Sequence, residues 1–320
     1  MASDIRNVIV LGATGNVGRE IIKALLTTDP PFNVTAARRQ NPSTSSPWPF
    51  PPNTRLKEVT VDYASVTSLK QTFINQHAVI EAFNPSMAIY QDRIVQAAVE
   101  TNTIKHIITP DFSSDTFSKV NKELLIFEPK IKAQTALESL IQQRSDLHWT
   151  AIIAGPFFDW AIPKSLFWIN PTTHEVTNFG SGDQRISMST LDMVGRATLA
   201  VLRNPASFQD RPAYFADYTV SSNELLAMLQ DMDAGKADAE PWVANSIALD
   251  GWLSMAKQLW EKDTEDGVED RLNSTAYRML GTYGLFEEGN RYGADFGDRV
   301  EVGFGVDETV FRQVLGRLVG

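Results

Sequence analysis

Short apolar runs alternate with amphipathic segments along the first half of the chain. The first run, Val8 to Leu11, suits a strand buried on both faces. The segment 16–26 that follows places Ile21 and Leu25 on one helical face. The same alternation predicts strands at 32–37, 56–61, 78–83, 104–109 and 149–154, and helices at 66–73, 89–100 and 129–143. Such a pattern predicts an α/β fold with a doubly wound parallel sheet.

The pattern changes after Gly155. A helix at 189–202 and a strand at 213–216 still fit the sheet, whereas the chain from Ser221 onward reads mostly as helix and irregular structure. We therefore predict a Rossmann-type domain in residues 1–155, with return elements around 186–218. A smaller substrate-binding lobe is predicted in 156–185 and 219–320.

A proline-rich segment, Gln40 to Asn53, interrupts the alternation and is predicted to be a surface loop. In a doubly wound sheet the ligand lies across the carboxyl ends of the strands. The candidate binding loops are those that follow Leu11, Ala37, Val61, Phe83, Ile108 and Ala154.

The first of these loops carries a glycine pattern. Gly12 lets the chain turn off the strand, Gly15 lets the backbone approach a pyrophosphate, and Gly18 lets the helix pack closely. The unpaired N–H groups of the helix then face the phosphates. Tight packing alone is the alternative explanation of such glycines, but strand, turn and helix stand in the order that dinucleotide binding requires. The expected contacts in this loop are Gly12, Thr14, Gly15, Asn16, Val17 and Gly18.

The second predicted strand ends in two arginines. Arg38 lies twenty residues after Gly18, where a site selective for NAD usually carries Asp or Glu. A guanidinium group binds the 2′-phosphate of NADP by charge-assisted hydrogen bonds, and a carboxylate would repel it. Arg38 and Arg39 therefore favour NADP(H), the alternative being a solvated pair at a strand end.

Composition excludes several classes of function. The 320 residues are 43% hydrophobic and carry a net charge of −10, so a large core is available and a nucleic-acid partner is not expected. The absence of cysteine excludes thiolate chemistry, and the four histidines (His77, His106, His148 and His174) lack metal-ligand spacing. No apolar run approaches the length of a membrane span, and no signal segment precedes the first strand. We expect a cytoplasmic protein, a monomer or homodimer, without a metal or membrane partner.

Two lysines at the start of a predicted helix, Lys130 and Lys132, lie on different faces of that helix. Lys130 shares a stripe with Ala133 and Leu137, whereas Lys132 aligns with polar positions. An inward ammonium in the first turn has a lowered pKa, because burial and the helix dipole disfavour its charge. Lys130 is thus a candidate acid–base group. It could equally be paired with Asp111 or Asp115, or extend to solvent.

The familiar alternative on this fold, a tyrosine followed four residues later by lysine, does not occur in this sequence. Aromatic residues are frequent in the predicted smaller lobe. They indicate either an aromatic-lined pocket or ordinary core packing. The group consists of Trp160, Trp168, Trp242, Trp252, Trp260, Tyr277, Tyr283, Phe286 and Tyr292.

The chain resembles the NmrA-like family of atypical short-chain dehydrogenases, within it the fungal type of isoflavone-reductase-like protein. The motifs that carry the resemblance are GATGNVG at 12–18, IKHIITPDFSSDT at 104–116, FEPK at 127–130, GPFFDW at 155–160 and VSSNELL at 220–226. The resemblance covers nearly the whole chain. It implies that Lys130 is the acid–base group, that Arg38 takes the 2′-phosphate and that residues 155–158 border the nicotinamide.

The remaining candidate residues follow from the binding loops and from this resemblance. Further cofactor contacts are expected at Asp62, Phe83, Asn84, Pro110, Gly155, Pro156, Phe157 and Phe158. Substrate contacts are expected at Asp111, Phe112, Asp159, Trp160 and Lys164. The sequence departs from the family at 109–113, where Thr-Pro-Asp-Phe-Ser replaces Pro-Ser-Glu-Phe-Gly, and at Gln134 and Thr135, where plant reductases often carry arginines. A different loop geometry and a different substrate from the plant enzymes are therefore expected.

The leading functional hypothesis is an NADPH-dependent reductase of a small, largely apolar or aromatic metabolite, in specialised metabolism. The bond reduced is C=C, C=O, C=N or a benzylic ether. Two alternatives stay open. One is a non-catalytic NADP(H) sensor that regulates a protein partner, against which the presence of Lys130 argues. The other is a redox-neutral isomerase or cyclase that uses the same lysine.

Overall fold

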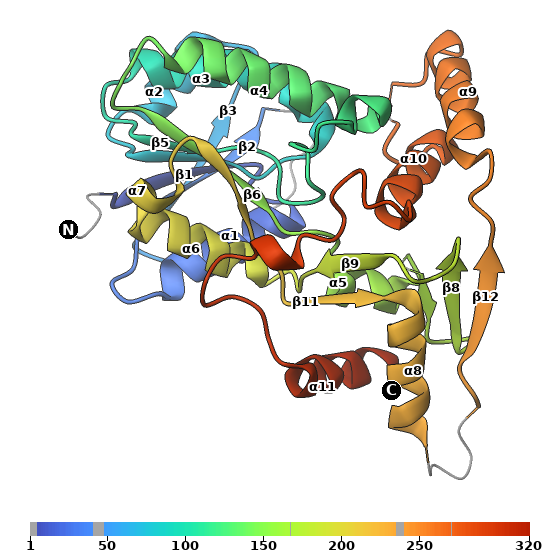
Figure 1. The fold of residues 1–320 in the computed structure, drawn as a ribbon. Helices are drawn as coiled ribbons and strands as arrows, with labels where there is room; N and C mark the ends of the chain where they lie inside the picture. Colours follow the sequence, from blue (N-terminus) through green and yellow to red (C-terminus); the bar gives the residue numbers. More distant parts are fainter. Residues whose placement is uncertain (1–4, 41–47, 167, 235–239, 270) are drawn as a thin grey trace. The chain divides into compact units, whose positions relative to one another are not determined.

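The computed structural model describes residues 5–40, 48–166, 168–234, 240–269 and 271–320 (Figure 1). The chain divides into two compact units. Unit 1 comprises residues 1–112, 129–153 and 191–213, and unit 2 comprises residues 113–128, 154–190 and 214–320. Part of the predicted proline-rich loop, residues 41–47, lies outside the described residues.

Unit 1 is built on a seven-stranded sheet with the strand order β10-β6-β5-β4-β1-β2-β3. Its strands are β1 (Asn7–Leu11), β2 (Asn33–Arg39), β3 (Leu56–Val61), β4 (Ala78–Glu81), β5 (His106–Ile108), β6 (His148–Ile153) and β10 (Arg211–Tyr214). All neighbouring pairs from β3 to β6 are parallel. The strand order reverses between β1 and β4, and ligands of such sheets bind outside the carboxyl ends of the strands at that point. The predicted fold class is confirmed.

Helices cover both faces of this sheet, with α1 and α6 on one face and α2, α3 and α4 on the other (Figure 1). The helical elements of this part of the chain are α1 (Asn16–Thr27), α2 (Val66–Phe73), η1 (Pro85–Tyr90), α3 (Gln91–Glu100), α4 (Glu128–Ile141), α6 (Met193–Arg203) and α7 (Pro205–Phe208). The apolar face of α1 is buried at Ile21, Ile22 and Leu25, as its spacing predicts. Residues Val8 to Leu11 of β1 are fully buried, which explains their unbroken apolar run.

Two predicted boundaries are wrong in the return segment. The helix predicted at 189–202 begins only at Met193, because the backbone of Ser189 pairs with Phe157 and the N–H of Thr190 donates to the Asp217 carboxylate at 2.6 Å. The strand predicted at 213–216 is β10, Arg211–Tyr214. The backbone contacts of Ser189 and Thr190 keep this segment extended, although its local sequence pattern favours a helix.

Unit 2 contains short strands that the sequence pattern did not predict. A three-stranded sheet joins β12 (Val243–Ile247), β8 (Glu175–Phe179) and β7 (Ile169–Asn170), and a two-stranded sheet joins β11 (Tyr218–Ser221) and β9 (Arg185–Met188). Its helical elements are η2 (Asn121–Glu123), η3 (Leu125–Phe127), α5 (Phe158–Ala161), η4 (Ile162–Lys164), α8 (Ser222–Asp233), α9 (Trp252–Glu265), α10 (Thr275–Phe286), η5 (Gly297–Arg299) and α11 (Glu308–Val319).

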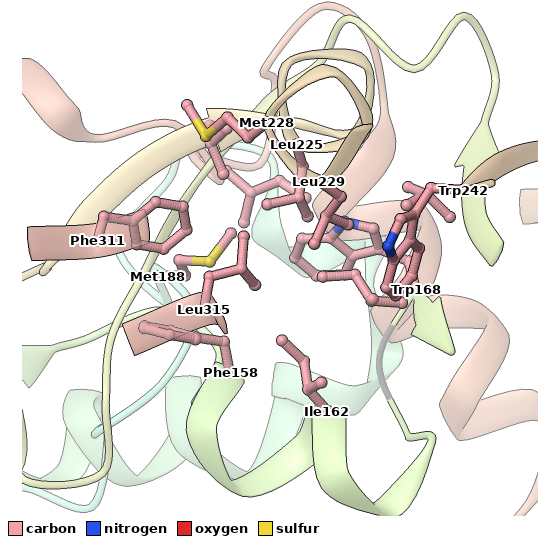
Figure 2. Packing of buried hydrophobic residues seen from close by; sticks show 14 of the residues in the cluster. Phe158, Ile162, Trp168, Met188, Leu225, Met228, Leu229, Trp242, Phe311 and Leu315 are labelled. Atoms are coloured by element: carbon pink, nitrogen blue, oxygen red, sulfur yellow. The ribbon is translucent and has the colours of Figure 1, made fainter. Parts of the chain in front are cut away.

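Aromatic and aliphatic side chains from these elements form one apolar core (Figure 2). Trp168 and Trp242 lie in it, and the ring of Phe158 packs on Phe311 with ring centroids 5.5 Å apart. Core packing therefore explains Trp168, Trp242 and Phe286 of the aromatic group, which are almost fully buried. Trp160 differs, because it remains 36% exposed.

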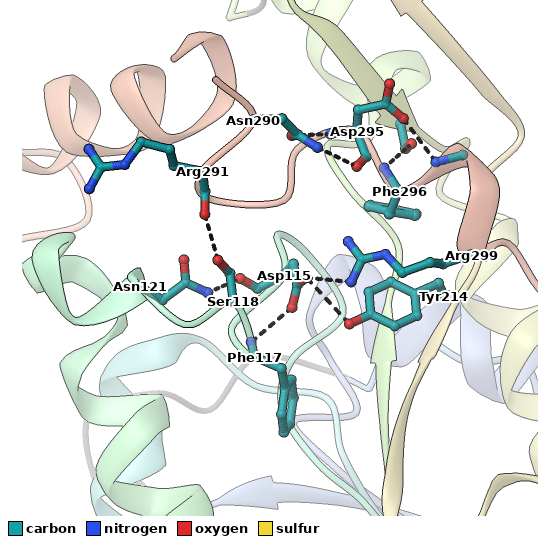
Figure 3. Close-up of polar contacts among 12 residues, drawn as sticks. Asp115, Phe117, Ser118, Asn121, Tyr214, Asn290, Arg291, Asp295, Phe296 and Arg299 are labelled. Carbon is teal, nitrogen blue, oxygen red and sulfur yellow. Dashed lines mark hydrogen bonds and ion pairs between the residues drawn. The ribbon is translucent and has the colours of Figure 1, made fainter. Parts of the chain in front are cut away.

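The segment 113–128, predicted in the Rossmann domain, belongs instead to unit 2. The buried carboxylate of Asp115 accepts hydrogen bonds from the Phe117 N–H at 2.8 Å, from Arg299 at 3.1 Å and from the Tyr214 hydroxyl at 3.3 Å (Figure 3). The Ser118 hydroxyl donates to the carbonyl of Arg291 at 2.6 Å. Phe117 is a neighbour in the sequence, but the other partners lie about 100 residues or more away from Asp115 or Ser118. The local sequence pattern therefore contains no signal for these contacts.

Candidate cofactor and active site

The turn after β1 contains glycines with two different roles, close packing within the protein and room for a ligand. Gly12 has φ +75°, and a Cβ atom there would lie 2.3 Å from the carbonyl oxygen of Ala82. A Cβ at Gly18 would lie 2.5 Å from the carbonyl oxygen of Gly12. Gly15 is different, because its Cβ would be in ordinary contact, 3.4 Å from that same oxygen. The protein's own packing thus requires Gly12 and Gly18, and it leaves Gly15 as the position where a ligand can use the missing side chain.

Helix α1 begins at this turn without a side-chain cap. Its N-cap is Gly15, so no side chain accepts hydrogen bonds from the amides of the first turn. Asn16 is exposed, and Thr14 and Val17 are half-buried. Uncapped amides at the positive end of a helix dipole form a site for phosphate. This end of α1 therefore fits the pyrophosphate of a dinucleotide.

A buried tyrosine lies directly under the glycine turn. The Gly12 N–H donates a hydrogen bond to the hydroxyl of Tyr63 at 2.9 Å, and Tyr63 is 2% exposed. Burial raises the pKa of this hydroxyl, so it stays protonated. Sequence reasoning missed Tyr63. The available signal is its place directly after Asp62, at the carboxyl end of β3.

The two arginines occupy the end of β2 as predicted. The guanidinium of Arg38 lies 4.5 Å from the ring centroid of Trp48, a cation–π contact, and Arg38 is half-buried. Arg39 is exposed and donates to the sulfur of Met87 at 3.4 Å. Trp48 thus holds the guanidinium of Arg38 against the loop, so Arg38 is not simply a solvated residue.

The other cofactor candidates of unit 1 differ in accessibility. Asp62 is exposed, and its carboxylate accepts from the N–H of Ala64 at 2.9 Å. Phe83 is half-buried against Tyr63, with ring centroids 6.1 Å apart, and Asn84 is exposed. Pro110 is buried in the turn that follows β5.

That turn is tight and strained. The N–H of Asp111 bonds back to the carbonyl of Thr109 at 2.9 Å, and the Thr109 hydroxyl donates to the Asp111 carboxylate at 2.6 Å. Phe112 has φ +28°, a conformation that side chains rarely adopt. Both Asp111 and Phe112 are buried. This loop holds the departure from the family pattern, and its unusual backbone agrees with the expected change of loop geometry.

Lys130 points inward from the first turn of α4, whereas Lys132 is exposed. The Lys130 ammonium donates to the carbonyl oxygen of Asp111 at 2.8 Å. Burial lowers the pKa of Lys130, and the nearby Asp111 carboxylate opposes part of that effect. The predicted orientation is confirmed, and Asp111 is the residue that holds the ammonium in place.

A second buried ionisable group lies between Lys130 and the glycine turn. Glu81 ends β4, pairs in register with Leu11 of β1 and is fully buried. One carboxyl oxygen accepts from the Gln91 amide at 3.2 Å, and the other, Oε2, has no hydrogen-bond partner within the described residues. Burial and the Asp111 charge raise the pKa of Glu81 well above its usual value. The sequence analysis missed this residue, because Glu81 sits inside an otherwise apolar run.

The candidates after β6 belong to unit 2. Gly155 has φ +65°, and a Cβ there would lie 2.0 Å from the carbonyl oxygen of Ser187, so only glycine fits. Pro156 and Phe157 are half-buried. Phe158 is 1% exposed, and its ring belongs to the apolar core. The predicted cofactor contact at Phe158 stays a prediction.

The substrate candidates that follow form a local surface pair. The ammonium of Lys164 lies 4.2 Å from the ring centroid of Trp160 and donates to the Trp160 carbonyl at 3.0 Å. Asp159 is half-buried beside them. This pair accounts for Trp160 and Lys164 as surface residues, and their substrate role stays a prediction.

A small cavity lies beside Gly155 and Pro156 in unit 2. Its volume is about 10 Å³, roughly room for one water molecule. Phe127, Tyr292 and Phe296 contribute aromatic walls. Leu285 and several small residues complete the lining, the small ones being Ser114, Gly281, Gly284, Gly293 and Ala294.

The glycine turn lies within a region that matches a known protein family. A family model described as NAD(P)H-binding matches residues 12–183, which begin at Gly12 and include more than half of the chain. The chain belongs to the NAD(P)H-binding family. The predicted nicotinamide dinucleotide cofactor is therefore confirmed, and the uncapped start of α1 is the part of this NAD(P)H-binding fold that suits its phosphates.

Relatives of this NAD(P)H-binding protein occur in fungi and plants. It is 28% identical to oxidoreductase aprR of Aspergillus flavus, over 70% of this chain and 73% of that protein. It is 22% identical to phenylcoumaran benzylic ether reductase PT1 of Pinus taeda, over 69% of this chain and 73% of that protein. The resemblance to isoflavone-reductase-like proteins, fungal type, is confirmed.

Solved structures share the fold. One is AtPrR2 with NADP⁺ and (+)pinoresinol, at 15% identity and a TM-score of 0.68, covering 92% of both chains. Another is a ternary complex of leucoanthocyanidin reductase from Vitis vinifera, at 14% identity and a TM-score of 0.69, covering 98% of this chain and 99% of that one. At such identities the likeness concerns the fold alone.

Across the part of the chain that the structure describes, no group of three or more His, Cys, Asp or Glu side chains could hold a metal ion. Within the same ranges, no helix has the length and apolarity needed to cross a membrane.

The buried Glu81 should make stability depend on pH. Its pKa is raised in the folded protein, so the folded state binds a proton that the unfolded state has lost, and stability falls as pH rises above the unfolded pKa of about 4.3. Glu81→Gln removes this linkage. We expect the variant to gain stability over the parent as pH increases from 5 to 9, by at most about 1.4 kcal/mol per pH unit.

Urea unfolding followed by tryptophan fluorescence across this pH range measures the effect. The exposed Glu58→Gln is the matched control, because it makes the same chemical change on β3. A constant stability difference between Glu81→Gln and the parent at all pH values would contradict the protonated state of Glu81.

Proposed function

We propose that this NADP(H)-dependent oxidoreductase reduces a C=C, C=O or C=N bond of a small, largely apolar or aromatic metabolite, with Lys130 as the acid–base group. The observation that carries the proposal is the buried ammonium of Lys130, held by the carbonyl of Asp111 next to the carboxyl end of β5. A buried ammonium with a lowered pKa is unusual in a purely structural role. Bound NADPH supplies the hydride.

The residues of unit 1 have separate tasks in this proposal. The uncapped amides of α1 bind the pyrophosphate, and Arg38 binds the 2′-phosphate. Asp111 fixes the position of the Lys130 Nζ through its carbonyl, and Lys130 delivers a proton to the substrate atom that gains negative charge. Lys130 then recovers a proton from solvent.

The proposed substrate class is supported by the names of relatives and not by the small cavity of unit 2. The residues lining the small cavity beside Gly155 are aromatic, aliphatic or small, and the Ser114 and Tyr292 hydroxyls are its side-chain polar groups. That cavity has a volume of about 10 Å³, room for roughly one water molecule, so it does not hold a metabolite. The names of relatives, phenylcoumaran benzylic ether reductase among them, agree with an aromatic substrate class.

Oxidation of NADPH, followed at its absorbance band, tests the activity with small enones, aromatic ketones and cyclic imines. Turnover of any of these classes supports the reductase. Tight NADPH binding without turnover of any class would contradict it and favour an NADP(H) sensor, whereas a substrate rearranged without NADPH consumption would favour an isomerase.

Arg38 should decide the choice between the two nicotinamide cofactors. We expect Arg38→Ala to weaken NADPH binding by roughly 10- to 150-fold, because a charge-assisted hydrogen bond contributes about 1.5–3 kcal/mol. Binding of NADH should change less than about threefold, since it lacks the 2′-phosphate. Calorimetric titration of both cofactors measures this.

Arg55→Ala is the matched control for Arg38. Arg55 is exposed just before β3, at the other end of the β2–β3 pair, and it carries the same charge. Equal weakening of NADPH by the two substitutions would show a general charge effect and contradict 2′-phosphate recognition by Arg38.

A further inference from the structure

Three of the four histidines of the chain line one cavity of unit 1. His77 immediately precedes β4, His106 begins β5 and His148 begins β6, so the cavity lies at the amino-terminal edge of the sheet. The glycine turn and Lys130 lie near the opposite, carboxyl edge. The cavity has a volume of about 580 Å³, within the range of small-molecule sites in proteins, roughly 300–1,000 Å³. The proposed reductase site does not use it.

The hydrogen bonds of His106 define its tautomer. The ring is 1% exposed, and its Nε2 lies 2.8 Å from the hydroxyl oxygen of Thr150. That hydroxyl donates its own hydrogen to the carbonyl of Phe208 at 2.7 Å. Nε2 of His106 must therefore carry the hydrogen and donate it, which leaves Nδ1 as a bare acceptor.

His106 is a neutral imidazole with an unused acceptor. Burial and the nearby His148 lower its pKa to about 4, so the ring is uncharged at neutral pH. The bond to Thr150 is its sole side-chain hydrogen bond among the described residues, so no protein group there occupies Nδ1. Because Nδ1 has no protein partner there, it is available to accept a hydrogen bond from a ligand in the cavity.

The other two histidines offer complementary groups. Nδ1 of His77 accepts from the Arg6 N–H at 3.0 Å, so the hydrogen of the neutral ring is on Nε2. Nδ1 of His148 lies 2.8 Å from the Asp210 carboxylate and donates to it, which leaves Nε2 as an acceptor in the neutral ring. The cavity thus presents one imidazole donor and two acceptors.

Charged side chains at the cavity compensate one another. The Lys105 ammonium pairs with the Asp146 carboxylate, which also accepts from Arg144 at 3.0 Å. These two hydrogen bonds hold the pKa of Asp146 below its usual range, so the pairs persist at neutral pH. The walls between the polar groups are apolar, with Ile5, Pro205 and Ala206 among them. A ligand here meets neutral hydrogen-bonding groups, apolar surface and the Lys105–Asp146 ion pair.

We propose that this cavity is a second small-molecule site, specific for a neutral hydroxyaromatic compound. A phenolic O–H donates to Nδ1 of His106, the phenolic oxygen accepts from Nε2 of His77, and the aromatic ring packs on Ile5, Pro205 and Ala206. A carboxylate is disfavoured beside His106, because the bare lone pair of its Nδ1 repels an anion. The site is independent of Lys130 and of the proposed reductase activity.

Binding of 2-naphthol to the full chain saturated with NADP⁺ tests the proposal. Titration calorimetry gives the affinity, and NMR of protein labelled with ¹³C in its histidine rings shows which imidazoles respond. We expect His77, His106 and His148 to shift and His174 to stay unchanged. We also expect 2-methoxynaphthalene, which has no hydroxyl hydrogen, to bind at least tenfold more weakly, and 2-naphthoate likewise.

Two tryptophan substitutions on α7 form a matched pair. Ala206 is exposed on the cavity wall, and Ala206→Trp fills the cavity. Ser207 is equally exposed on the same helix but does not line the cavity, so Ser207→Trp is the control. We expect Ala206→Trp to weaken 2-naphthol at least tenfold and Ser207→Trp less than twofold. Absence of 2-naphthol binding, binding that survives Ala206→Trp, or equal binding of the methoxy compound would each overturn the proposal.

Discussion

Lys130→Met is expected to slow substrate-dependent NADPH oxidation by about 10²- to 10⁴-fold, the usual contribution of a positioned acid–base group. The affinity for NADPH should change less than about twofold, because Lys130 bonds to Asp111 and not to the glycine turn. Methionine preserves the length and apolar stem of the side chain, so the buried stripe of α4 stays filled. Stopped-flow turnover and calorimetry measure the two quantities separately.

Lys132→Met provides the control for this substitution. Lys132 lies on the same helix, two residues away and exposed, and its replacement should leave the rate unchanged. In the parent protein the rate should also fall at alkaline pH, because Lys130 donates a proton only while protonated and its pKa is lowered by burial. Parent-like turnover by Lys130→Met would remove Lys130 from the reaction.

Gly12→Ala and Gly15→Ala are expected to fail in different ways. Alanine at Gly12 would sit at φ +75° with its Cβ 2.3 Å from the carbonyl oxygen of Ala82. The conformation costs about 1–2 kcal/mol and the overlap about 1–3 kcal/mol, so the protein without cofactor should lose roughly 2–5 kcal/mol of stability. Thermal unfolding should shift downward by about 3–7 °C.

Gly15→Ala should leave the stability of the protein without cofactor nearly unchanged. Its φ is −74° and the added Cβ would be in ordinary contact at 3.4 Å. The methyl group would instead occupy the space in which the backbone meets the pyrophosphate, so NADPH should bind at least about tenfold more weakly. Thermal unfolding with and without NADPH separates the two effects. Loss of stability in both variants alike would mean that the turn is a packing feature only.

Local spacing was enough to predict the elements of unit 1 and the orientation of Lys130. The 3.6-residue period that places Lys130 with Ala133 and Leu137 also turns Lys132 to solvent. The roles assigned to Arg38 and Lys130 stay predictions, because they concern contacts with a cofactor and a substrate.

The features that sequence reasoning missed depend on distant neighbours. Tyr63 meets Gly12 across 51 residues, and Glu81 is buried because β1 and β5 flank β4. Strand β12 is mostly exposed, so it has no alternation of apolar and polar positions to reveal it. Asp115 joins unit 2 through Arg299, 184 residues further along the chain. None of these contacts leaves a periodic signal in the sequence near the residue concerned.

Each of the two units is formed by three separate stretches of the chain, which affects folding during synthesis and recombination between related genes. The sheet that carries the glycine turn gains its last strand, β10, only at residues 211–214, and α6, whose Gly195 packs against Ala24 of α1, also comes late in the chain. A nascent chain ending near residue 155 would expose β6 as an unpaired edge and leave that face of α1 uncovered. Neither unit corresponds to one continuous stretch of the gene, so recombination between relatives cannot exchange a cofactor module for another without dividing the second unit as well.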